Sequence, residues 1–265
     1  MTATRKLTAA LACAVGMAAL MGCGGGHGRK VSSPASSARA ASPAAVTSSP
    51  AAGPALKELT AAQISDRAMA AMKGLSSAVV DTQSVADGQT SRTTLAMTAK
   101  GVCTGHLKVS GATLAVVRVG GTTYIKGDNA WWKGQGAPGS PGVAAVVKGR
   151  WVKMTAGSME DKTYTYLCDL SLDLEIYDPG QGGVLTKGAP TVVDGEPVIP
   201  ISGLVQGSTQ TTYVATRGKP YVVKSVESGP DAAGVDFSGF DEPVSAVAPP
   251  ASQTVDESEL TRFGI

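Results

Sequence analysis

Hydrophobic residues in this sequence follow three different patterns along the chain. An apolar run from Leu7 to Leu20 comes first, and a stretch rich in Gly, Ser, Ala and Pro follows it. After Leu59 apolar residues recur every three or four positions, and beyond Gly74 they recur every second position. These two periods are typical of an amphipathic helix and of half-buried strands. The sequence therefore predicts one helix followed by a mostly β domain.

The helix has a recognisable start and end. Thr60 and Gln63 have the spacing of a capping box, and Gly74 is a natural end for a helix. Between them Ile64, Ala68 and Met72 form an apolar stripe.

The strands are expected to form an antiparallel sheet. Leu95 and Met97 alternate with Thr94, Ala96 and Thr98. The Gly120-Gly121 pair separates the runs 114–119 and 122–126, a pattern typical of a meander. Short helices are expected within 141–151 and 160–177. Later, turns at 195–197, 218–220 and 241–243 recur every 23 residues, each with a proline before an apolar run, which predicts long hairpins. The fold class is α+β, with helices over one face of the sheet.

The N-terminal segment suggests export. Residues 1–22 have the basic start, short apolar run and small residue before a cysteine that define a bacterial lipoprotein signal, and Leu20 to Cys23 resembles a lipobox. We expect Cys23 to carry a diacylglyceryl group and fatty acyl chains such as palmitate, anchoring the protein to the outer face of the cell membrane. The alternative is an ordinary secretory signal that happens to contain a cysteine. Residues 23–55 are expected to be a tether, 56–250 the folded domain, and 251–265 a loose tail.

Charge and composition exclude several functions. Without Arg5 and Lys6, basic and acidic residues balance at 21 each, so we expect no nucleic-acid partner. His27 and His106 are the only histidines, so we expect no metal, no cofactor and no catalytic triad. An enzyme would need perturbed carboxylates, for example among Asp169, Asp173 and Glu175, whose spacing in a helix better fits a solvated face.

Two thiols remain for the exported domain. Cys103 and Cys168 are the only cysteines after Cys23, and an even number in an oxidising compartment suggests a disulfide. The alternative is a pair of unbonded buried thiols.

Three short motifs resemble one known family. The segments 119–126, 215–221 and 237–244 (VGGTTYIK, ATRGKPY and FSGFDEPV) are similar to those of the actinobacterial LppX/LprG-type lipoproteins, which are akin to the carrier LolA. The resemblance covers roughly 56–250. It implies a strongly curved antiparallel half-barrel whose concave face is covered by helices around an apolar cavity that holds acyl chains.

The candidate residues of that cavity are large and apolar. They are Met69, Met72, Leu95, Met97, Leu114, Val116, Tyr124, Trp132 and Trp151. For the tryptophans, packing in the core is the better interpretation than lining a ligand mouth, because large aromatic side chains usually bury for stability. The methionines can likewise fill gaps in the core. The leading hypothesis is a non-enzymatic envelope protein that shelters a lipid or lipidated glycoconjugate. The alternative is an interaction or sensing module with a filled core that contacts another envelope protein.

Overall fold

A computed structural model describes residues 55–86, 88–135, 142–176, 178, 180, 183–205, 207–229 and 232–260. The expected signal peptide, Cys23 and the tether as far as residue 54 lie outside these residues. No helix in the described part of the chain is long and apolar enough to cross a membrane.

The first helix forms where the capping box predicts it. A 3-10 turn, η1 (Leu56–Glu58), leads into α1 (Ala61–Lys73), and Gly74 ends the helix. The Gln63 amide donates to Thr60 Oγ1 at 3.3 Å, and the Thr60 amide donates to Gln63 Oε1 at 3.0 Å. The stripe that includes Ile64 and Met72 is buried, so the period of the sequence identified the inward side.

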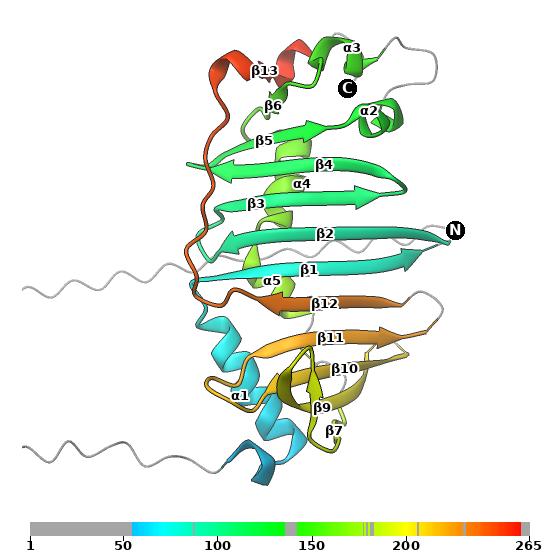
Figure 1. The fold of residues 1–265 in the computed structure, drawn as a ribbon, viewed down its shortest axis with the longest axis vertical. Helices are drawn as coiled ribbons and strands as arrows, with labels where there is room; N and C mark the ends of the chain where they lie inside the picture. Colours follow the sequence, from blue (N-terminus) through cyan, green and yellow to red (C-terminus); the bar gives the residue numbers. More distant parts are fainter. Residues whose placement is uncertain are drawn as a thin grey trace, which may run out of the picture. The chain divides into compact units, whose positions relative to one another are not determined.

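Thirteen strands of the described chain form one sheet. They are β1 (Ser77–Ala86), β2 (Gln89–Thr98), β3 (Cys103–Val109), β4 (Ala112–Val119), β5 (Thr122–Gly127), β6 (Trp151–Lys153), β7 (Thr186–Lys187), β8 (Thr191–Val193), β9 (Glu196–Val205), β10 (Ser208–Ala215), β11 (Val222–Ser228), β12 (Ala233–Ser238) and β13 (Thr254–Asp256). Their order is β13-β6-β5-β4-β3-β2-β1-β12-β11-β10-β9-β7, and β8 pairs with β9. All pairs are antiparallel except β13 with β6. The sheet is open, and β7 and β9 turn away from the direction of the upper strands (Figure 1).

The sheet has a covered inner face and a solvated outer face. Register aligns Val80, Leu95, Val116 and Ile125 across neighbouring strands on the inner face, and each is at most 4% exposed. They belong to one core with α1 and with α5 (Leu170–Ile176). Helix α4 (Met159–Leu167) and α5 pass behind the strands, while α2 (Asn129–Gln135) and α3 (Val143–Val147) lie beyond β5 (Figure 1). The α+β class with helices over one face is confirmed.

A disulfide ties the helices to the sheet. Cys103 at the start of β3 and Cys168 at the end of α4 are bonded, and both are fully buried. The pairing predicted from the cysteine count is therefore present. Because α5 begins two residues after Cys168, the bridge fixes the start of α5 against the inner face.

The expected loose tail is wrong for residues 251–260. After η3 (Ala251–Gln253), β13 adds a parallel edge strand, and η4 (Glu257–Glu259) brings Leu260 into the core. Glu257 accepts hydrogen bonds from the Thr155 amide at 2.6 Å and from Ser158 Oγ at 3.3 Å. Strand β13 has only three residues, and Leu260 is the one large apolar residue within 257–260. Such a short, mostly polar segment shows no hydrophobic periodicity, so the sequence pattern did not predict this element.

Candidate functional site

Most of the predicted cavity residues fill the core. They are Met69, Met72, Leu95, Met97, Leu114, Val116 and Trp132, and each is at most 6% exposed. Tyr124 and Trp151 do not join them. Ile125 and Val152 face inward as a registered pair, so alternation puts Tyr124 and Trp151 on the opposite face of the sheet.

Trp132 is fixed by the end of β5. Its Nε1–H donates to the Gly127 carbonyl at 2.9 Å, and the side chain is 5% exposed. A Cβ on Gly127 would come within 2.5 Å of Trp131 and 2.9 Å of Trp132, so a glycine is required for this approach. The geometry fits the core-packing interpretation of Trp132 better than a ligand mouth.

An apolar pocket lies between α1, α5 and the β2–β3 turn. We name it the α1–α5 pocket; its volume is about 240 Å³, and it is lined by Met72, Lys73, Leu75, Ala99, Leu170, Ser171 and Leu174. Of the predicted cavity residues, Met72 lines it. Leu170 and Leu174 were not among the predicted cavity residues, although their spacing of four residues places them on one side of a helix. Their position opposite α1 depends on how the fold places α5.

The carboxylates considered for an enzyme have structural surroundings where they are described. Asp169 accepts a hydrogen bond from the Ser171 amide at 3.0 Å at the start of α5. The side chains of Asp173 and Glu175 lie outside the described set, and His106 is exposed on the outer face. Among the described residues, no three His, Cys, Asp or Glu side chains are grouped to hold a metal ion.

The most buried acidic group holds α4 on the sheet. Asp161, 6% exposed, accepts from Thr123 Oγ1 at 2.8 Å and from the Gly157 amide at 2.9 Å, and it lies 3.4 Å from Arg118 Nη1. These partners account for a buried charge without a catalytic role. On the same helix, burial raises the pKa of Tyr164 to about 12, and the negative charges of Glu160 and Glu257 add to this increase.

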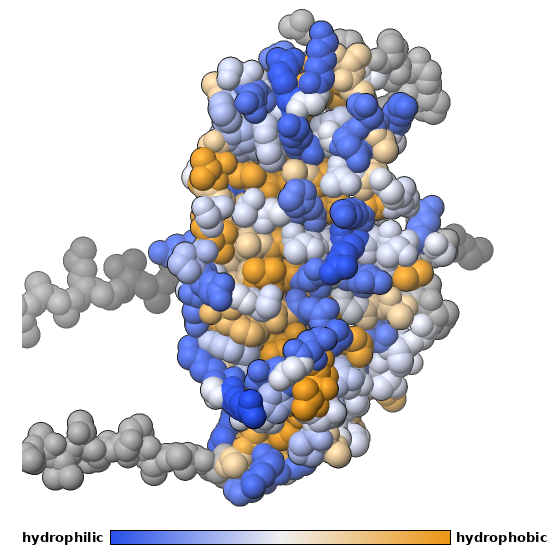
Figure 2. All heavy atoms as spheres, in the orientation of Figure 1, coloured by the Kyte–Doolittle hydropathy of each residue, from blue (hydrophilic) through white to orange (hydrophobic). Residues whose placement is uncertain are grey.

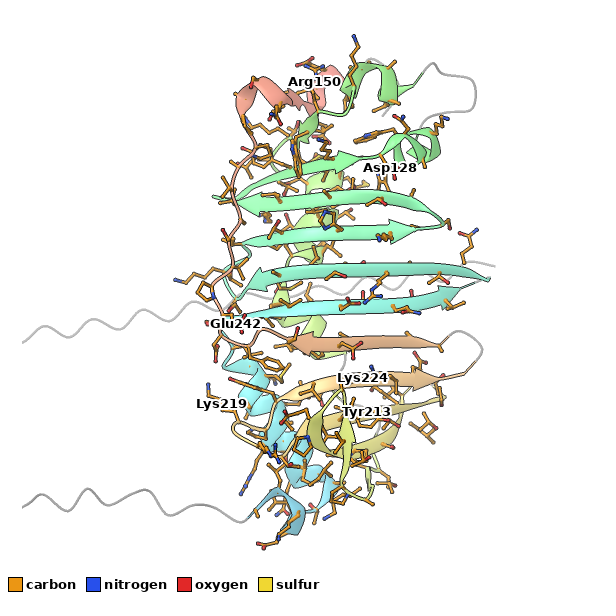
Figure 3. All side chains as sticks on the ribbon, viewed as in Figure 1. Asp128, Arg150, Tyr213, Lys219, Lys224 and Glu242 are labelled. Carbon is orange, nitrogen blue, oxygen red and sulfur yellow. A yellow bond between two sulfur atoms is a disulfide. The ribbon has the colours of Figure 1, made fainter. Side chains whose placement is uncertain are left out.

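The recurring turns of the sequence meet at one end of the sheet. Residues 195–197 span the start of β9 and residues 218–220 precede β11, as expected. No strand begins directly after 241–243, so that part of the hairpin prediction is wrong. Asp241 instead connects segments: it accepts from the Ser76 amide (2.9 Å), Ser76 Oγ (3.1 Å), Tyr221 Oη (2.9 Å) and Lys219 Nζ (3.2 Å). These donors, the Ser76 amide foremost, hold the pKa of Asp241 well below its usual range. Figure 3 shows Lys219 and Glu242 at this end.

Comparison with solved structures finds similar folds at low identity. Mycobacterium tuberculosis lipoprotein LppX shares 16% identity over 71% of this chain and 98% of its own, with a TM-score of 0.47. LprF from Mycobacterium bovis shares 15% over 72% and 97%, with a TM-score of 0.49. This chain is similar to LppX and LprF. The family suggested by the sequence motifs is thus among the structures found.

A further match is MucB of Pseudomonas aeruginosa in complex with MucA. It shares 16% identity over 73% of this chain and 59% of the matched chain, with a TM-score of 0.34. No protein-family profile matches the sequence. No curated protein matches it either.

Proposed function

We propose that this protein is an exported lipoprotein, anchored through Cys23, that holds an apolar chain at the α1–α5 pocket. In this proposal residues 1–22 are removed as a signal, residues 23–55 tether the domain, and no chemical reaction is catalysed. The supporting observation is the pocket itself, an apolar opening between two helices that leads to the core.

The lining chemistry suits hydrocarbon. Leucine side chains and the flexible thioether of Met72 adapt to an acyl chain of variable shape. Each methylene removed from water contributes about 0.8 kcal/mol, so affinity requires no charged contact. The volume of about 240 Å³ is below the roughly 300–1,000 Å³ of ordinary ligand sites, which favours one acyl segment over two chains.

A longer chain would require the helices to separate. The Cys103–Cys168 bond fixes the start of α5, and the hydrogen bonds of Asp161 fix α4. Between α1 and α5, Met72, Leu170 and Leu174 meet through apolar contacts in the core, which allow sliding more readily than a covalent bond does. We therefore expect widening to occur by movement of α1 relative to α5, with the disulfide end as the fixed point.

One observation favours the alternative of an interaction module. Leu95, Met97, Leu114 and Val116 are each at most 1% exposed, so side chains occupy the centre of the inner face. A filled core of this kind supports a domain whose surface contacts another envelope protein. The two functions differ in one property, which is uptake of an apolar ligand.

Uptake is measurable with a fluorescent acyl probe. We would titrate the chain from residue 23, carrying Cys23→Ser to remove the proposed acyl group, with cis-parinaric acid. The carrier proposal expects saturable binding at one site, and Ser171→Trp, which fills the α1–α5 pocket from an exposed position, weakens binding at least about tenfold.

The matched control is Lys162→Trp, an exposed position on α4 outside the pocket, which leaves the affinity unchanged. Absence of binding to the unsubstituted chain would overturn the carrier and favour the interaction module. Equal binding by Ser171→Trp and the unsubstituted chain would place the ligand elsewhere and reject the α1–α5 pocket.

A further inference from the structure

A second and larger pocket lies on the outer face, on the opposite side of the sheet from the α1–α5 pocket. We name it the outer pocket; its volume is about 590 Å³. The β8–β9 hairpin, the turn before β11 and the end of β12 surround it. This size lies within the usual range for small-molecule sites. Figure 2 shows apolar side chains among charged ones over this part of the sheet.

The pocket has an apolar floor and an aromatic wall. Val193, Ala215 and Val223 contribute aliphatic surface. The rings of Tyr221 and Phe240 stack with centroids 4.3 Å apart, at an interplanar angle of 25°. Because Tyr221 Oη donates to Asp241, the wall is fixed before any ligand arrives. Such a surface binds hydrocarbon, and aromatic rings also attract alkylammonium groups.

Lysines hold the pocket walls in place. Lys224 Nζ lies 2.7 Å from Asp236 on β12 and 3.7 Å from Asp194 in the β8–β9 turn, so it links the floor to the hairpin. Lys219 is paired with Asp241. Figure 3 shows Lys224 beside Tyr213, with Lys219 towards the end of the sheet. These charges are satisfied within the protein and are not available to a ligand.

Two opposite charges at the pocket remain available. Arg217 and Glu196 line it, and neither has an ion-pair partner among the described residues. The Thr216 amide donates to the Pro197 carbonyl at 2.9 Å, so Arg217 and Glu196 lie on adjacent chain segments at the same end of the sheet. A ligand that matches this pocket would carry one negative and one positive group, to pair with Arg217 and Glu196, and a hydrocarbon chain to cover the apolar floor.

We propose that the outer pocket binds a zwitterionic amphiphile, with a phosphate group at Arg217, an ammonium group at Glu196 and an apolar chain over Val193, Ala215 and Val223. A phospholipid, or a smaller zwitterionic molecule that also carries an apolar chain, would supply this chemistry. The guanidinium suits phosphate because it presents several donors in one plane. This site is independent of the proposed α1–α5 function.

The test compares probes that share a chain and differ in charge. NMR titration of the Cys23→Ser chain would use hexylphosphocholine, hexyl phosphate, hexyltrimethylammonium and hexyl glucoside, together with phosphocholine that lacks a chain. We expect hexylphosphocholine to bind about tenfold more tightly than each of the others. Shifts are expected at Ala215, Val223 and Phe240. Phosphocholine binding as tightly as hexylphosphocholine would identify a small-metabolite site and reject the apolar floor.

Variants separate this site from the α1–α5 pocket. Arg217→Ala and Glu196→Gln are each expected to reduce hexylphosphocholine affinity to that of hexyl glucoside, whereas Lys126→Ala and Glu58→Gln, which change exposed charges elsewhere, do not. Ser171→Trp should leave hexylphosphocholine binding intact, and Arg217→Ala should leave parinarate binding intact. The proposal is overturned if hexyl glucoside binds as well as hexylphosphocholine, if no probe binds, or if shifts appear at Leu75 and Leu170 instead.

Discussion

Gly105 allows a close contact at the centre of the sheet. It is registered opposite Leu95, and an added Cβ would collide with the Thr94 carbonyl oxygen and approach Leu95 Cα and Cδ2 to 2.9 Å. Backbone atoms are among these neighbours, so a rotamer change cannot relieve the clash. The glycine therefore lets the Leu95 side chain extend over β3 on the inner face.

We predict that Gly105→Ala destabilises the domain by at least about 2 kcal/mol, because overpacking of this kind costs about 1–3 kcal/mol even where side chains adjust. Chemical denaturation measures the change. The control is Gly134→Ala in α2, where nothing lies within 4 Å of the new methyl group and helix propensity favours alanine by up to about 1 kcal/mol. Equal stabilities for Gly105→Ala and the unsubstituted protein would disprove the described contact.

Asp241 couples stability to pH. Its folded pKa is held below the ordinary value by the Ser76 amide, Tyr221 and Lys219. A depressed pKa means that the stabilisation is present above about pH 4 and is lost as pH falls towards the folded value. Asp241→Asn should therefore flatten the decline of the unfolding midpoint below pH 4.

The comparison is with Asp66→Asn, an exposed carboxylate on α1, which should retain the steeper decline. Thermal melts from pH 2 to pH 7 provide the measurement, with the pH range set by the ordinary carboxylate pKa of about 4. Identical acid profiles for Asp241→Asn and Asp66→Asn would mean that the hydrogen bonds to Asp241 contribute nothing to folding.

At the scale of elements, the final segment stabilises the β6 edge of the sheet. Leu260 is 2% exposed within the core, and Val255 pairs in register with Val152. Leu260→Ala is expected to lower the free energy of unfolding by about 2–5 kcal/mol, the usual cost of removing a buried leucine side chain. Val247→Ala, at a side chain that is 75% exposed, should change it by less than about 0.5 kcal/mol. A stability of Leu260→Ala within that smaller range would mean that residues 251–260 do not pack as described.

Elements with a clear period could be predicted from sequence, and very short ones could not. The helix around Ile64 and the strand around Leu95 have enough residues to display periods of 3.6 and 2. Strands β6, β7, β8 and β13 contain two or three residues each, which is too few for any period. Their formation depends on neighbouring strands that the rest of the fold supplies.

The candidate sites were harder to predict because they combine distant segments. Met72 was expected near a ligand, but its neighbours Leu170 and Leu174 come from a helix whose position depends on the Cys103–Cys168 bond. The outer pocket depends on the position of β12, which pairs with β11 and with β1, so that the residues after its end lie beside Tyr221 and Ser76. The sequence repeat drew attention to the turns at 195–197, 218–220 and 241–243, but only the order of the strands in the sheet shows that they lie close together.

At the scale of the whole domain, one sheet separates two possible binding regions. The inner face packs against α1 and α5. Side chains such as Leu95 and Val116 fill the centre of this face, and the α1–α5 pocket lies at one end of it. The outer face has the larger pocket with charged residues around it. Under the two proposals, purely apolar ligands bind on the inner side and charged amphiphiles bind on the outer side.

The most direct test is the content of the inner pocket in the cell. The protein would be purified with an affinity tag from the envelope of its own host, alongside Ser171→Trp and Lys162→Trp, and organic extracts would be compared by mass spectrometry. We predict that an acyl-containing molecule accompanies the unsubstituted protein and Lys162→Trp and is depleted from Ser171→Trp. Extracts of all three proteins that lack any such molecule, apart from acyl groups attached at Cys23, would contradict the carrier function.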